Sequence, residues 1–126
     1  MKRLILAFFL SAPAFAAKTD AKLDCIYAGR DFTYDCIIRL DPPTEGVHVT
    51  VSADMPSMPM AHTVKPTKAK PAGRGEYRAR LELEMTGEWA VKLRLAGAAR
   101  DLLVLHYEFD ERGARPVRRS AKSPRK

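Results

Sequence analysis

Residues 76–85 read EYRARLELEM, and this stretch decides the class of fold. Apolar side chains stand at every second position from Tyr77 to Met85, and charged side chains stand between them. A period of two is typical of a β-strand with one face in a core and the other in water. The following residues, TGEWAVKLRL, begin with a turn at 86–88 and alternate again from Trp89 to Leu95. We therefore expect the two segments to pair as a hairpin, with Trp89 in the core.

The same period of two recurs on both sides of this stretch, and no segment has the period of an amphipathic helix. Proline and glycine interrupt the chain at 41–46 and 68–75, where we expect loops. The strands predicted besides the two above are 23–28, 32–40, 47–52, 62–66 and 101–109. The sequence thus predicts an all-β fold, an immunoglobulin-like antiparallel β-sandwich of about seven strands. A small barrel is the alternative.

The N-terminal residues have the pattern of a secretory signal peptide. A basic start, MKR, precedes an apolar run at 4–10 and an Ala-x-Ala ending at Ala16. The apolar run is too short to cross a bilayer of about 30 Å. We expect residues 1–16 to be removed on export to the periplasm, the alternative being a buried N-terminal strand or helix.

Charge is unevenly distributed along the chain, whose formal net charge is +7. Two bases lie in the signal peptide and seven follow Glu111, which leaves residues 4–111 with 13 bases and 15 acids. A basic globular surface for nucleic acid is therefore not expected. We predict one domain at 17–111 and a disordered basic tail at 112–126. The tail is either a solvated end or an electrostatic contact to anionic lipids or to an acidic partner.

The chain contains two cysteines, Cys25 and Cys36. Turn-forming residues at 29–31 separate two segments that favour strands, so a hairpin would bring the cysteines together. In an oxidising compartment this spacing favours a structural disulfide. The alternative is a thiol pair that binds a soft metal or exchanges disulfides.

A methionine-rich segment carries the most distinctive chemistry, reading MPSMPMAH at 55–62. In an extended segment Met58, Met60 and His62 would face the same side, and Met55 could fold over from the preceding turn. Three thioethers and one imidazole favour Cu(I) over Zn²⁺, Mg²⁺ or Ca²⁺. The alternative is that the methionines are flexible core filler beside a solvated histidine.

Other residues give weaker signals. His48 is the best candidate for a fifth metal donor, whereas His106 is expected to be a surface residue. No serine lies in a recognisable catalytic arrangement, and no phosphate loop precedes a helix. We therefore do not expect an enzyme.

The sequence resembles the YtkA-like family, which is related to FixH-like proteins. The resemblance lies in a strand at 47–51, MPSMPMAH at 55–62, GEY at 75–77 and MTGEW at 85–89, and it covers about residues 45–96. It implies an immunoglobulin-like sandwich, a role in copper handling, and a metal site at Met55, Met58, Met60 and His62. The chain departs from the FixH-like pattern in having no transmembrane helix after the signal peptide. The cysteine hairpin and the basic tail are also outside the family pattern.

The sequence is compatible with two functions. The first is a periplasmic Cu(I) chaperone or buffer that passes copper by ligand exchange to an envelope protein such as a multicopper oxidase, an oxidase or an exporter. The second is a metal-free β-sandwich that serves as an interaction module or an accessory subunit of an envelope complex.

Overall fold

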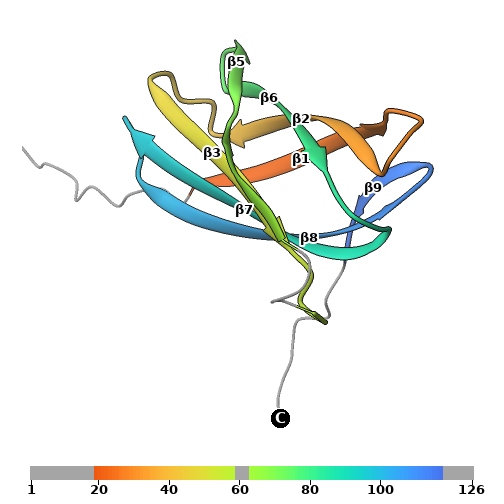
Figure 1. Ribbon diagram of the computed structural model, residues 1–126. Coiled ribbons are helices and arrows are strands. Elements are labelled where there is room, and N and C mark those ends of the chain that lie inside the picture. The colour runs from red at the N-terminus through yellow and green to blue at the C-terminus, as the bar shows by residue number, and fades with distance from the viewer. Residues whose placement is uncertain (1–18, 59–62, 118–126) are drawn as a thin grey trace, which may run out of the picture.

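The computed structural model describes residues 19–58 and 63–117, which form nine β-strands (Figure 1). The strands are β1 (Asp20–Tyr27), β2 (Thr33–Asp41), β3 (Val47–Asp54), β4 (Thr63–Lys68), β5 (Lys70–Gly73), β6 (Glu76–Glu82), β7 (Gly87–Gly97), β8 (Asp101–Asp110) and β9 (Gly113–Pro116). In these two ranges there is no helix, and hence none long and apolar enough to cross a membrane. The predicted signal peptide and the end of the predicted tail lie outside the described residues.

The strands form two antiparallel sheets that pack face to face. Sheet A has the order β1-β2-β6-β5, and sheet B has the order β4-β3-β7-β8-β9. Alternate side chains of both sheets point inward, and the most deeply buried large ones are Trp89, Tyr34, Phe109, Ile38 and Leu81. The predicted β-sandwich is confirmed. The two strands beyond the seven expected are β5 and β9.

The predicted hairpin between residues 76–85 and 89–95 is wrong. Strand β6 pairs with β2 and β5 in sheet A, whereas β7 pairs with β3 and β8 in sheet B. Residues 83–86 carry the chain from one sheet to the other. Alternation fixes which side chains face the core, but two strands with apolar faces satisfy it equally well as neighbours in one sheet or as opposites across a sandwich.

The expected loop at 68–75 contains the short edge strand β5. Proline is tolerated there because an edge strand needs no N–H on its open side. Pro71 stands opposite Tyr77 in the register with β6. Just before β5, the N–H of Ala69 donates to the carbonyl oxygen of Val49 at 2.9 Å. Strands β4 and β5 are therefore separated by a single residue, Ala69, at which the chain passes from sheet B to sheet A.

The predicted start of the disordered tail at residue 112 is also wrong. Strand β9 extends the fold to Pro116 and pairs with β8. Two of the bases assigned to the tail hold one carboxylate: the Arg115 guanidinium donates to Asp110 at 2.8 Å, and the Arg112 N–H donates to it at the same distance. A two-residue turn with a charged anchor thus replaces the expected free end. Residues 118–126 lie outside the described part of the chain.

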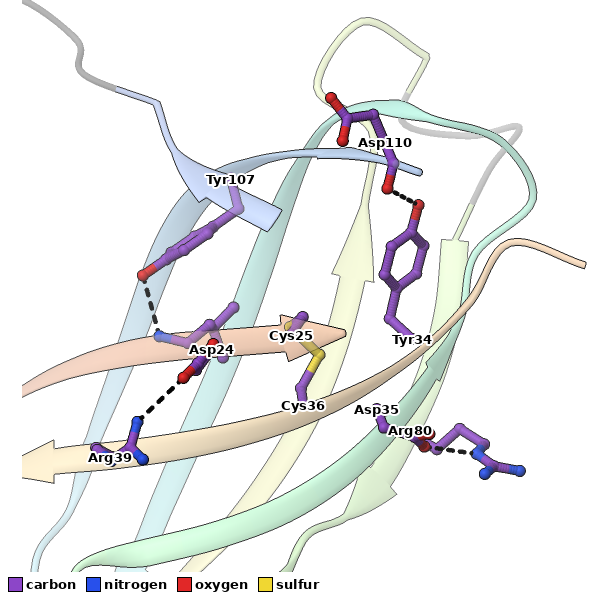
Figure 2. The surroundings of a disulfide bond; sticks show 10 residues. Asp24, Cys25, Tyr34, Asp35, Cys36, Arg39, Arg80, Tyr107 and Asp110 are labelled. Carbon is purple, nitrogen blue, oxygen red and sulfur yellow. Dashed lines mark hydrogen bonds and ion pairs between the residues drawn. A yellow bond between two sulfur atoms is a disulfide. The ribbon is translucent and has the colours of Figure 1, made fainter. Parts of the chain in front are cut away.

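The disulfide predicted between Cys25 and Cys36 is confirmed. The two residues are opposite each other on β1 and β2, and both side chains face the core, at 6% and 2% exposure. Figure 2 shows the disulfide with a hydrogen bond on either side of it that joins sheet A to sheet B. The Tyr34 hydroxyl donates to the carbonyl oxygen of Asp110, and the Leu23 N–H donates to the Tyr107 hydroxyl. The buried, bridged sulfurs support a structural role and not thiol exchange.

Candidate functional site

The methionine segment follows β3 at one end of sheet B. Its first residues form a turn in which the Met58 N–H donates to the carbonyl oxygen of Met55 at 2.9 Å. Pro56 stands at the second position of this turn, where its fixed φ angle is favourable. At the far end of the segment β4 begins with Thr63, which pairs with Asp54. Both ends of the segment 55–62 are therefore anchored side by side on the sheet.

The two described methionines of this segment have different environments. Met55 is 4% exposed and belongs to the hydrophobic core. Met58 is 40% exposed and presents its side chain to solvent. Met60 and His62 lie outside the described residues, so the predicted common face of Met58, Met60 and His62 stays a prediction.

Met55 reaches the beginning of β7. A Cβ atom placed on Gly87 would lie 3.0 Å from the Met55 Cε atom. Gly87 also has a φ angle of +130°, which residues other than glycine rarely adopt. Two parts of the sequence that carry the family resemblance, at 55–62 and 85–89, are therefore in contact through these residues. In the same motif the Trp89 indole donates to the carbonyl oxygen of Met85 at 3.1 Å, which explains the spacing of these two residues in packing terms.

His48 does not belong to this site. It is exposed near the start of β3, whereas Met55 follows the end of that strand. A rise of about 3.3 Å per residue separates the two by roughly 23 Å. The structure therefore does not bring His48 beside Met55 or Met58, and its role as a fifth donor stays a prediction.

His106 lies nearer to the methionine segment than His48 does. It stands opposite Ala90 on β7, which in turn stands opposite Asp54 on β3. Two strand spacings, about 10 Å, separate His106 from Asp54 along this row. The His106 Nδ1 atom lies 3.3 Å from a Glu88 carboxylate oxygen, without the geometry of a hydrogen bond. Only the pairing of β3, β7 and β8 reveals this placement, and no spacing in the sequence signals it.

The charges around the anchor of the segment are balanced. The Asp54 carboxylate forms an ion pair with Lys92 at 3.0 Å. Within 19–58 and 63–117, no group of three or more histidine, cysteine, aspartate or glutamate side chains is arranged to hold a metal ion.

Comparison with known families finds a match over residues 40–94, to the family described as YtkA-like. This range runs from the end of β2 into β7, and it includes both the methionine segment and the Met85–Trp89 motif. The predicted resemblance to the YtkA-like family is confirmed for this part of the chain. No curated protein and no solved structure matches the chain.

Proposed function

Starting from the YtkA-like match over residues 40–94, we propose that the protein is an exported Cu(I)-binding protein that acts as a chaperone or buffer. Its ligands are Met55, Met58, Met60 and His62. Residues 1–16 direct it to the periplasm, where the oxidised Cys25–Cys36 pair is stable. The relation to FixH-like proteins is part of this proposal.

The observation that carries the proposal is the exposed side chain of Met58 on an anchored turn. Thioethers are soft ligands that suit Cu(I), and they neither titrate nor form disulfides. The turn joins Met58 directly to Met55, and the Asp54–Thr63 pairing closes the segment. A closed segment limits the conformational entropy lost when several donors converge on one ion.

Exposure of Met58 also suits metal transfer. An incoming protein can place its own donor beside an exposed ligand, so the ion moves by stepwise ligand exchange without covalent chemistry. Because Met55 is buried in the core, its sulfur would have to bind the ion from the inner side of the turn. We propose as acceptor an envelope protein such as a multicopper oxidase, an oxidase or an exporter, with no catalysis by this chain.

A competition titration tests the proposal. The mature chain, beginning at Ala17, is titrated against a chromophoric Cu(I) chelator, with ascorbate as reductant. The double variant Met58→Leu/Met60→Leu should lose Cu(I) binding and keep its thermal stability. Met85→Leu is the matched control, because Met85 is the remaining methionine of the mature chain and lies outside the segment. Unchanged Cu(I) affinity in the double variant would show that the ligands are wrongly assigned.

Burial of Met55 favours a second candidate function, a metal-free interaction module. In this case Met55 is core filler, and Met58 is part of an apolar contact surface for a partner. The second candidate requires that the unmodified mature chain shows no competition with the chelator. It also requires that Met58→Leu retains partner binding, because leucine preserves most of the apolar area.

A further inference from the structure

A second surface, remote from the methionine turn, has features of a binding site. The outer face of sheet A contains a hollow of about 580 Å³. It is lined on β1 and β2 by Ile26 and Ile37, and on β6 and the chain around Ala69 by Lys68, Lys70, Arg78 and Arg80. Asp24 and Asp35 also line the β1–β2 side, so that side combines apolar and acidic groups, whereas the opposite side is cationic.

One apolar side chain of the β1–β2 side is unusually exposed. Ile26 is 69% exposed, the highest value among the large apolar side chains of the described residues. It points away from the core, as does Ile37 in the neighbouring strand. Two outward isoleucines on an otherwise charged sheet face contribute nothing to the core, and such apolar surface is a common feature of contact sites.

The cationic side is only partly neutralised. Arg80 forms an ion pair with Asp35 at 2.9 Å, drawn in Figure 2, and the other acid of the hollow, Asp24, is 3.6 Å from Arg39. Among the described residues, no acid forms an ion pair with Lys68, Lys70 or Arg78. These three cations stand together where β5 meets β6 and are exposed.

The main chain adds unpaired polar groups at the same place. The Cα atoms of Cys25 and Cys36 are 4.0 Å apart, the short distance of a pair without mutual hydrogen bonds. Cys36 therefore directs its N–H and C=O toward β6, where it is opposite Ala79. Because these directions alternate along a strand, Arg78 and Arg80 direct theirs away from β2.

Of these two arginines, only Arg78 has a partner strand on the side that faces away from β2. Lys70 stands opposite Arg78, and there the register of β5 on β6 ends, because the chain passes at Ala69 into sheet B. No described strand pairs with Arg80 on this side. Its N–H and C=O thus face the opening beside Lys68.

We propose that this hollow binds a short acidic segment of a partner protein, with one large apolar side chain on Ile26 and Ile37 and carboxylates toward Lys68, Lys70 and Arg78. The mixed, half-open lining favours a peptide over a lipid tail, which would need an enclosed apolar cavity. Crossing the sheet from β1 to β5 takes roughly 14 Å, or about four to five extended residues. Residues 118–126 of this chain do not fit, since they carry five bases and no acid.

The test uses the mature chain and a fluorescein-labelled peptide that has two glutamates on each side of a leucine. Fluorescence anisotropy measures binding to the unmodified protein and to Lys70→Glu/Arg78→Glu. We expect the double variant to bind the peptide with an affinity at least about tenfold weaker. The control is Arg94→Glu/Arg100→Glu, which makes the same change in charge at exposed sites outside the hollow. This control should bind like the unmodified protein.

A second comparison examines the apolar contact. Ile26→Ser should weaken binding of the leucine peptide and have little effect on binding of a peptide with serine in place of leucine. Equal weakening by both charge variants would reduce the effect to general electrostatics and overturn the proposal. It would also be overturned if Lys70→Glu/Arg78→Glu abolished a dimer, or abolished binding to phosphatidylglycerol vesicles, while the peptide failed to bind. These measurements are independent of copper, so a failed copper titration leaves the hollow proposal intact.

Discussion

The hydroxyl of Tyr77 on β6 donates to the carbonyl oxygen of Val47 on β3 at 2.7 Å, so one side chain joins sheet A to sheet B through the core. Tyr34 and Tyr107 make the same kind of connection. Each of these tyrosines packs an apolar ring in the core, and its hydroxyl forms a hydrogen bond with a main-chain group of the other sheet. The sandwich is thus held by specific bonds as well as by apolar contact.

Tyr77→Phe is expected to lower the free energy of unfolding by about 1–2 kcal/mol, because it leaves the Val47 carbonyl without this buried donor. Urea denaturation followed by tryptophan fluorescence measures the change. Tyr27→Phe is the control, since no hydrogen bond of the Tyr27 hydroxyl occurs within the described part of the chain. Equal effects of the two substitutions would mean that the bond adds nothing beyond ring packing.

Stability should fall in acid because of Asp110. Hydrogen bonds from the Arg115 side chain and the Arg112 N–H hold the pKa of Asp110 well below its usual range. A lowered folded-state pKa stabilises the protein above the ordinary carboxylate pKa of about 4, and this contribution is lost as pH falls further. Thermal melts between pH 7 and pH 2 should therefore show a smaller acid-induced decrease for Asp110→Asn than for the unmodified protein. An Asp110→Asn curve parallel to the unmodified one would contradict the assignment.

Met55 and Met58 should contribute very differently to folding. Met55→Ala removes a buried side chain and is expected to cost about 2–5 kcal/mol. Met58→Ala removes an exposed one and should stay within about 0.5 kcal/mol of the unmodified protein. Chemical denaturation without metal separates the two effects from copper binding. A large loss in Met58→Ala would place its side chain in the core and weaken the case for an accessible ligand.

Removing the disulfide should destabilise the isolated domain. In the chain-entropy model, a loop closed by residues 11 apart in sequence contributes roughly 2–3 kcal/mol. Cys25→Ala/Cys36→Ala should shift the denaturation midpoint accordingly, and reductant should then have no further effect on this variant. If the midpoint does not move, pairing of β1 with β2 alone is sufficient to order the hairpin.

Much of the fold follows from the alternation of residues, whereas strand partners do not. The segment 76–85 is correctly predicted to have Tyr77 inward, yet its partner strands depend on contacts distant in sequence. Strands β5 and β9 cannot be predicted from the sequence pattern, because they contain Pro71 and Gly113. Short edge strands need few ladder bonds and tolerate residues that disrupt central strands.

The candidate site shows a similar division. The donor types at 55–62 are evident in the sequence, and the burial of Met55 against Gly87 is not. The proximity of His106 to Asp54 depends on the register of β3, β7 and β8, which no local pattern specifies.

The passage of the chain through Ala69 has a mechanical consequence. Because β4 and β5 are consecutive, a shearing force between the sheets must first break ladder bonds on one side of Ala69. At the opposite side, β9 lies against β1 without such a covalent link, and a Cβ atom on Gly113 would lie 2.7 Å from the Cys25 carbonyl oxygen. Of the two margins of the sandwich, only the one formed by β4 and β5 has consecutive edge strands, and opening fluctuations should start at the margin where Gly113 meets Cys25.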